Sequence, residues 1–401
     1  MWAYARQTQV IASYWKGPVV ATLLLILPFA VEADILGDRI DLIVASEVMH
    51  DDNLFRTANG EESDTRLRLG VGLEGEFDIG RQNIRLDALA HKNRFSDFDN
   101  LDYSGYSANV LWNWVASDRF SGAVWGGVAE DLADFDEFLT NTRDKTETQD
   151  YGLEVGYNAS NRFRIETSLR HSAFEHSLRS RERSNETTSE AELAILYRTP
   201  GGSMFGAIAS HIDGEFPDRD VIPGVSTIDD GYEQRRYGAT IRLNPGAKTS
   251  VRLDLGRTRR EQDNLSGRDF SEPWWRFEVS WDPSTRLSFR LVSDQDIRSV
   301  DNADSSFVSS RSIGFTPMWT PNDRLVLSAQ VQYRDMDFSE NVGSTFANRD
   351  DEQLQFTIRG RYNLRSWLRL RVSYDWGDRD SRDPRFERSY NRVVAGLEVV
   401  L

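Results

Sequence analysis

Residues 49–60, MHDDNLFRTANG, bring together several side chains that could do chemistry. His50, one of five histidines in the chain, precedes Asp51, Asp52 and Asn53. Carboxylate and amide oxygens are ligands for calcium, and a histidine beside an aspartate is a typical acid–base pair. Calcium, however, takes about six to eight oxygen ligands, and this stretch supplies few. The other interpretation is a turn, since Asp and Asn bond their own backbone two residues onward, and the sequence favours it.

Enzyme motifs elsewhere are missing or badly placed. The chain holds no G-x-S-x-G, P-loop or H-E-x-x-H motif in a context that would support it. His171 and His176 stand near serines, but the alternation in RFRIETSLRHSAF puts His171 on the lipid-facing side of a strand. A buried catalytic triad is hard to assemble there. We therefore expect no catalytic residue, no cofactor, no metal site and no enzymatic activity.

Arginine is the most frequent group with recognition chemistry. Its guanidinium is a planar, permanently charged fork donor that suits carboxylates, phosphates and sugar hydroxyls. By strand alternation the candidates for one polar, inward face are Arg66, Arg68, Arg85, Arg164, Arg170, Arg242, Arg252, Arg276, Arg290, Arg359, Arg361, Arg369 and Arg371. Fewer acids share this predicted face, so we expect an Arg-biased wall for an anionic or hydroxylated substrate. The alternative is that Arg and Glu form ion pairs that brace a water-filled wall.

The elements that position these arginines are β-strands. In TRLRLGVGLEGEF, Leu67, Leu69 and Val71 fall on one face and Arg66 and Arg68 on the other, because strand side chains alternate with period two. QDYGLEVGYNA and SWLRLRVSYDW show the same alternation. No helical periodicity is sustained. The pattern predicts strands with one apolar and one polar face.

Short turns recur along the chain. WVASDRF, YNASNRF, WDPSTRL, WTPNDRL and YNLRSWL share one spacing, and DIGRQN, TPGGS and NPGAK are also short. Longer Asp- and Asn-rich connections lie between them, which excludes a propeller with three tight connections per blade. Alternating short and long connections are typical of outer-membrane barrels. We predict an all-β fold, a transmembrane antiparallel up-and-down β-barrel of about 18 strands with short periplasmic turns and long extracellular loops.

The N-terminus indicates export. Arg6 and Lys16 precede the apolar run VVATLLLILPFAV, which VEA follows. The run is shorter than the roughly 20 residues of a spanning helix, so a membrane anchor is the less favoured alternative. We predict a cleaved signal peptide at residues 1–33 and a single barrel domain at residues 34–401.

Composition narrows the partners. The net charge of -16 argues against nucleic acid, and the absence of cysteine excludes disulfides and thiolate metal sites. Mean hydropathy is -0.55, yet 11% of residues are aromatic, as in a transmembrane barrel. We expect the outer-membrane lipid bilayer to be a partner.

The sequence also resembles a known family. DRIDLIVASEVMHDDNLFRTANG and RLRLGVGLEGEFDIGRQNIRLDALAHKNRFSDFDNLDYSGYSANVLWNWVASDRFSG look like the EpsL-type β-barrel porins that are encoded beside exosortase-linked exopolysaccharide clusters. The resemblance is strongest over residues 38–122. The chain ends in Leu401, where barrel proteins usually carry an aromatic residue.

The resemblance implies a function. It is export of exopolysaccharide across the bacterial outer membrane through a passive conduit, with periplasmic polysaccharide-export proteins as partners. Two alternatives stay open: a general or solute-selective porin, and a non-conducting structural barrel that anchors matrix polymer.

Overall fold

The computed structural model describes residues 40–136, 141–220, 229–298, 307–338 and 349–401. The predicted signal peptide, residues 1–33, lies outside the described residues. The described strands are β1 (Ile40–Asp51), β2 (Asp64–Ile79), β3 (Gln82–Phe95), β4 (Tyr103–Val115), β5 (Phe120–Leu132), β6 (Lys145–Asn158), β7 (Phe163–His176), β8 (Glu186–Arg198), β9 (Met204–Glu215), β10 (Gly231–Gly246), β11 (Thr249–Gln262), β12 (Phe270–Ser284), β13 (Leu287–Arg298), β14 (Val308–Asn322), β15 (Leu325–Phe338), β16 (Asp350–Arg365), β17 (Leu368–Ser381) and β18 (Arg388–Val400).

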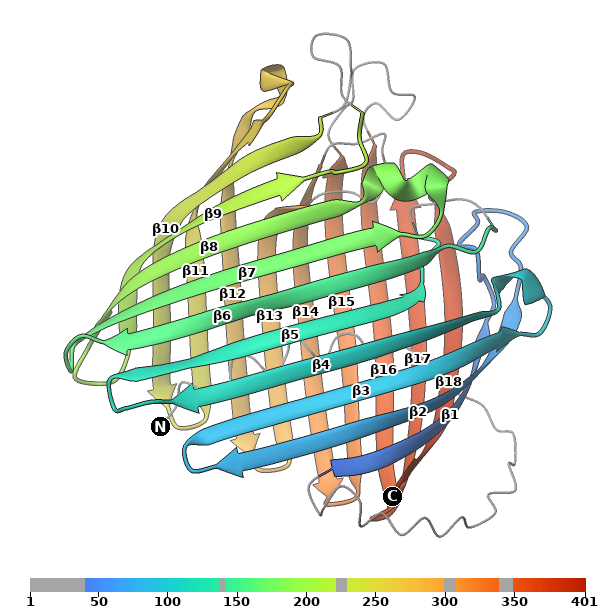
Figure 1. Ribbon diagram of the computed structural model, residues 1–401, viewed down its shortest axis with the longest axis horizontal. Helices are drawn as coiled ribbons and strands as arrows, with labels where there is room; N and C mark the ends of the chain where they lie inside the picture. The colour runs from blue at the N-terminus through green and yellow to red at the C-terminus, as the bar shows by residue number, and fades with distance from the viewer. Residues whose placement is uncertain (1–39, 137–140, 221–228, 299–306, 339–348) are drawn as a thin grey trace.

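These strands form one closed sheet. Each strand pairs with its neighbours in sequence, and the described residues make an 18-stranded sheet in which β1 also pairs with β18. Ile43 lies opposite Val400 in this antiparallel seam. Short turns therefore gather at one end of the barrel and long connections at the other (Figure 1). The prediction of an all-β, up-and-down barrel of about 18 strands is confirmed.

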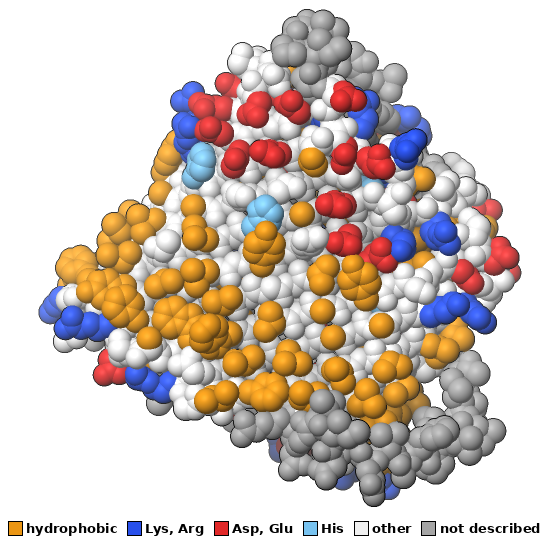
Figure 2. Space-filling model, in the orientation of Figure 1, with side chains coloured by type: hydrophobic (Ala, Val, Ile, Leu, Met, Phe, Trp, Pro, Cys, Tyr) orange, Lys and Arg blue, Asp and Glu red, His pale blue; other side chains and the backbone are white. Residues whose placement is uncertain are grey.

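The outer face of the wall is apolar. Val71, Leu169 and Ile358 are 55%, 50% and 44% exposed although they are hydrophobic, and they lie on the same side of the sheet. Figure 2 shows hydrophobic side chains spread over the front face of the barrel, with Asp and Glu gathered above them, towards the long connections. Such a surface is stable only against a hydrocarbon environment.

Aromatic side chains rim this surface beside the short turns. Phe120 stacks on Tyr157 at 4.6 Å between ring centroids, and Phe163 meets Tyr197 edge-on at 5.5 Å. Tyr and Trp rings are amphipathic and settle at the boundary between lipid and water. The short-turn end therefore carries an interfacial aromatic girdle.

The shared turn motif has a hydrogen-bonding cause. The Ser117 Oγ accepts hydrogen bonds from the backbone N–H groups of Arg119 and Phe120, each at 3.2 Å. The same pattern, a side-chain oxygen that accepts from the residues two and three positions later, recurs at Ser160, Ser284 and Asn322. In DIGRQN a different device applies, because Gly80 adopts a φ of 64°, which favours glycine.

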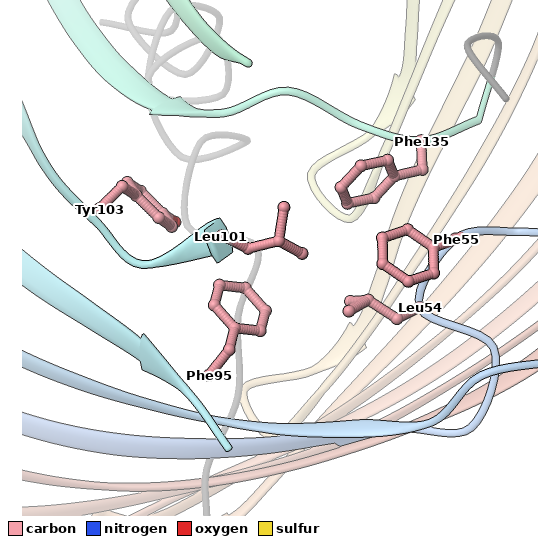
Figure 3. Close-up of a cluster of buried hydrophobic side chains, with 6 residues drawn as sticks. All are labelled: Leu54, Phe55, Phe95, Leu101, Tyr103 and Phe135. Carbon is pink, nitrogen blue, oxygen red and sulfur yellow. The ribbon is translucent and has the colours of Figure 1, made fainter. Parts of the chain in front are cut away.

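Three long connections pack together at the opposite end. Leu54 and Phe55 from the first connection join Leu101 from the second and Phe135 from the third in a buried cluster that also includes Phe95 and Tyr103 (Figure 3). Phe55 meets Phe135 edge-on at 5.1 Å. The hydrophobic pair in DNLF therefore anchors the connections to one another.

The described parts of the connections contain three short 3-10 helices, η2 (Asp99–Leu101), η3 (Arg179–Ser184) and η4 (Ser266–Arg268). Among the described residues no helix has the length and apolar character needed to cross a membrane.

Candidate functional site

The antiparallel register places the thirteen predicted arginines on one face of the sheet, opposite the exposed apolar side chains. For example, Arg68 lies opposite Glu47 and Asn93, and Arg164 lies opposite Asn158 and Leu196. Since the apolar surface faces outward, this face lines the interior of the barrel. Most of these arginines are bound to acids there.

A buried network surrounds the first two arginines. The Arg68 Nη2 donates to Asp131 at 2.8 Å, and its Nε donates to Asn93 at 2.9 Å. Arg66 pairs with Glu47 at 3.3 Å. Arg68 also donates to the Tyr103 hydroxyl of β4 at 3.3 Å, so the five strands β1–β5 meet in this network and these two guanidinium groups brace the wall.

Shared carboxylates hold most of the others. Glu166 accepts from both Arg164 and Arg242, each at 2.7 Å. The remaining pairs are Arg85–Glu76, Arg170–Asp150, Arg252–Asp254, Arg276–Glu278, Arg290–Glu278, Arg369–Glu74, Arg369–Glu398 and Arg371–Glu398. These eleven arginines therefore fit the alternative considered from the sequence, in which arginines and acids form ion pairs that brace the wall.

Two predicted arginines differ. Arg359 and Arg361 on β16 are exposed and form no ion pair or hydrogen bond with any described residue. Their cross-strand neighbours on β17 are Ser373 and Arg371, so no acid lies directly beside them. They present free donors to the interior.

The acids also include two unpaired members. Glu190 and Glu192 lie on the inward face of β8, opposite Arg170 and Ser168 on β7. Neither forms an ion pair or hydrogen bond within the described part of the chain. Glu190 lines a cavity of about 190 Å³ in the wall, together with Tyr232 and other inward residues of β7–β11.

The sequence overlooked inward arginines near the long connections. Arg260 is fully buried and lies 3.6 Å from the Tyr232 ring centroid, while the Tyr232 hydroxyl donates to Glu186 at 2.8 Å. Arg236 pairs with Asp296 at 2.6 Å. Strand alternation would have placed these arginines on the inward face. They were not predicted because β10 and β11 extend further towards the long connections than the sequence indicated.

The charges of the inward face divide between the two halves of the barrel. On β1–β9 the inward carboxylates are Asp41, Glu47, Asp51, Asp64, Glu74, Glu76, Asp78, Asp87, Asp131, Asp150, Glu154, Glu166, Glu186, Glu190 and Glu192. The inward arginines there are Arg66, Arg68, Arg85, Arg164, Arg170 and Arg198. Acids therefore dominate this half.

The other half is basic. On β10–β18 the inward arginines with described side chains are Arg236, Arg242, Arg252, Arg260, Arg276, Arg290, Arg334, Arg359, Arg361, Arg369, Arg371, Arg379, Arg388 and Arg392. The inward carboxylates there are Asp254, Glu272, Glu278, Asp294, Asp296, Asp351, Asp375 and Glu398. The expectation of an arginine surplus over the whole wall is wrong, because the register also brings many acids of β1–β9 inward.

The histidine considered for catalysis and the aspartates considered for calcium lie outside this arginine-lined part of the wall. His171 is on the outer face, with its Nδ1 3.0 Å from the Ser189 Oγ. The Asp51 carboxylate accepts two hydrogen bonds of 2.7 Å from Arg56. Asp52 accepts from the Asn391 backbone and amide groups at 2.7 and 2.8 Å. These protein donors already engage the two carboxylates that were considered for calcium.

The structure brings together three carboxylates that the sequence did not predict as a group. Asp335, Asp337 and Asp350, at the adjoining ends of β15 and β16, each offer an oxygen within 4.8 Å of the others. They lie on the outer face, and Asp337 is exposed. Sequence separation hides this group, because only strand pairing brings Asp350 to Asp337.

No curated protein matches the sequence. Similar solved structures include Acinetobacter baumannii OccAB3, with 11% identity, a TM-score of 0.45 and coverage of 90% of this chain and 98% of that one. Pseudomonas aeruginosa OccK2 (OpdF) has 13% identity, a TM-score of 0.47 and coverage of 90% and 98%. Pseudomonas aeruginosa OprD has 14% identity, a TM-score of 0.44 and coverage of 90% and 94%.

Part of the sequence also matches a family model. Residues 230–401 match the family described as "Putative beta-barrel porin 2". A closed barrel with an apolar outer belt and an aromatic girdle spans the bacterial outer membrane. The chain is a porin-like β-barrel of the bacterial outer membrane.

Proposed function

We propose that the protein is a passive channel for small polar solutes, which corresponds to the general or solute-selective porin considered from the sequence. The observation that carries this proposal is the pair of exposed arginines on the inward face of β16, Arg359 and Arg361, which have no ion-pair or hydrogen-bond partner among the described residues. An ion without a partner costs several kcal/mol in a dry environment. The exposed guanidinium groups of Arg359 and Arg361 therefore require water beside them.

The size of the barrel supports the same conclusion. Barrels of about 16–18 strands are wide enough to leave an aqueous channel between their walls. The match of residues 230–401 to a porin family model adds support from sequence. With water along charged walls, polar solutes cross without an energy source, and no bond has to be made or broken.

Reconstitution tests this function. Refolded protein in planar bilayers is expected to give discrete conductance steps in KCl, and liposomes that contain it are expected to swell in small sugars. Empty liposomes and heat-denatured protein are the controls. Folded protein that gives neither steps nor swelling would instead support the structural, matrix-anchoring barrel.

A second candidate is export of exopolysaccharide, with periplasmic export proteins as partners. It rests on the resemblance of residues 38–122 to the EpsL-type porins, a region that lies before the residues matched by the porin family model. Deletion of the gene is expected to trap polymer in the periplasm. Normal surface polysaccharide in the deletion strain would remove this role and leave the solute channel.

A further inference from the structure

A groove lies on the outer face of the barrel, over β8. Ser189 and Ala191 on β8 form its floor, Tyr151 and His171 stand on one side of it, and His211 on β9 stands on the other. The groove has a volume of about 620 Å³. Small side chains on β8 between larger ones on the neighbouring strands leave this space. The wall therefore offers a concave surface to the membrane.

The groove crosses the upper margin of the hydrophobic surface. Towards the short turns its border is apolar, with Leu153 and Leu169, and the exposed Ile195 continues along β8. Towards the long connections the border is polar, and the His171 Nδ1 lies 3.0 Å from the Ser189 Oγ. Hydrocarbon forms no hydrogen bonds with such polar groups, so this part of the groove lies at the level of lipid headgroups.

Three arginines continue this polar margin beyond His211. Arg235 on β10 lies directly opposite His211, and Arg259 on β11 lies directly opposite Arg235. Arg257 is on the same face of β11, two positions nearer the short turns. We call Arg235, Arg257 and Arg259 the outer arginine patch. No other pair of neighbouring strands in the described wall has three outward-facing cations.

The guanidinium groups of this patch are accessible at the membrane surface. The side chains of Arg235 and Arg259 are 45% and 58% exposed, and they pair with Glu233 and Glu261, which lie further towards the long connections. Exposed ion pairs of this kind contribute little to stability, so an anion can compete for the arginines. Arg257 is exposed and forms no ion pair with any described residue. The patch can therefore accept a phosphate, which fits the guanidinium fork.

We propose that the groove and the outer arginine patch bind one phosphorylated lipid of the outer leaflet, with an acyl chain in the groove and a phosphate at the patch. The groove is continuous with the hydrophobic surface that faces the membrane, so an acyl chain fills it. Charge complementarity favours a phosphorylated headgroup over a neutral one. Lipid A, a phosphorylated glycolipid, has this chemistry. The inference does not depend on the channel function, because all of these residues lie on the outer face.

Binding of lipid A to the refolded protein in detergent tests the proposal. Native mass spectrometry measures the bound fraction as lipid A is titrated, and lipid A from which the phosphates have been removed is the second probe. Wild type is expected to bind lipid A at least about fivefold more tightly than the dephosphorylated form, because guanidinium groups form charge-assisted hydrogen bonds with phosphate.

A triple variant tests the patch. Arg235→Gln/Arg257→Gln/Arg259→Gln is expected to weaken the binding of lipid A by about fivefold or more and to remove the preference for the phosphorylated probe. These side chains lie on the outer face and two of them take part only in exposed ion pairs, so the variant is expected to fold. Heat-dependent migration in detergent gels verifies that each variant is folded.

Two further variants complete the test. Lys92→Gln/Arg94→Gln/Arg311→Gln removes three outward-facing cations elsewhere on the wall and is expected to bind lipid A as wild type does. Ala191→Trp fills the floor of the groove with an apolar side chain that faces lipid. It is expected to weaken the binding of both probes by about fivefold, because the acyl chain loses its place.

Each contrary result overturns the proposal. Equal binding of the two probes by wild type, or undiminished binding by the patch variant, would remove the phosphate from the site. Equal losses in the patch variant and in the control with three cations removed elsewhere would indicate unspecific attraction to surface charge. A wild-type dimer that Ala191→Trp converts to monomers would assign the groove to a second copy of the chain instead of a lipid.

Discussion

Arg361 on β16 lies directly opposite Arg371 on β17 in the antiparallel register, on the inward face. Arg371 is held by Glu398 at 2.6 Å, whereas Arg361 has no such partner among the described residues. Like charges directly opposite each other destabilise a sheet. The repulsion persists in the fold, so the basic wall is maintained at some expense to stability.

Replacement of Arg361 by glutamate is expected to stabilise the barrel while weakening its basic wall. The new carboxylate would oppose Arg371 across the strands, and such pairs differ from like-charge pairs by about 0.2–1 kcal/mol. The unfolding midpoint in urea should rise slightly, and the permeability to Cl⁻ should fall. Arg361→Gln, which removes repulsion without adding attraction, should lie between the two. A midpoint below that of wild type would contradict this account.

The buried pair Asp51–Arg56 is expected to be more sensitive. Both side chains are nearly inaccessible, and Arg56 also lies 3.8 Å from the Tyr390 ring centroid. Asp51→Asn leaves the guanidinium without its bidentate partner, a loss of about 3–5 kcal/mol for a buried charge. Equilibrium unfolding in urea measures it. Asp99→Asn, at an exposed position in the second connection, should change little; equal losses in both would argue against the pair.

The aromatic cluster of the three connections predicts a local effect. Phe55→Ala removes a ring that contacts both Phe98 and Phe135, and such buried truncations cost about 3–5 kcal/mol. Because the cluster lies in connections rather than in the wall, the barrel should stay folded while cleavage by protease in residues 52–63 accelerates. Phe205→Ala, on the exposed outer face, is the control. Unchanged cleavage after Phe55→Ala would show that the ring does not hold the connection.

Acid should weaken the third connection through Asp144. Burial alone would raise the pKa of Asp144, but the hydrogen bond and charge of His176, the backbone N–H of Leu178 and the charge of Arg181 outweigh it and hold the pKa below its ordinary value of 3.8. A lowered pKa in the folded state contributes stability above about pH 4, which is lost as the pH falls through the folded pKa. Wild type should therefore lose more stability than Asp144→Asn between pH 6 and pH 3. Parallel curves for the two proteins would contradict this assignment.

Much of the fold could be predicted from local patterns. Alternation fixes which face each strand residue occupies, and the serine-based turn motif marks the hairpins, because both depend on neighbours in sequence. The inward position of Arg359 follows in this way. The sharing of Glu166 between Arg164 and Arg242 does not, since β7 and β10 are brought together only by the curvature of the wall.

Strand alternation alone could have predicted that the inward face is acidic on β1–β9 and basic on β10–β18. Asp51 is the last residue of β1, although the sequence favoured a turn over residues 49–60. Asp64 and Glu186 likewise stand at strand ends. Strands that extend past the membrane carry these acids inward as part of the wall. The arginines of the strand centres were therefore counted against too few acids.

The seam between β1 and β18 has a consequence for biogenesis. Ile43 gains its partner Val400 only after the last strand exists, so β1 keeps an open hydrogen-bonding edge throughout synthesis. Closure also joins the two most distant parts of the chain, the slowest kind of contact to form. The barrel therefore cannot close before β18 has been made, and until then the edges of β1 and β18 are open to pairing with other strands.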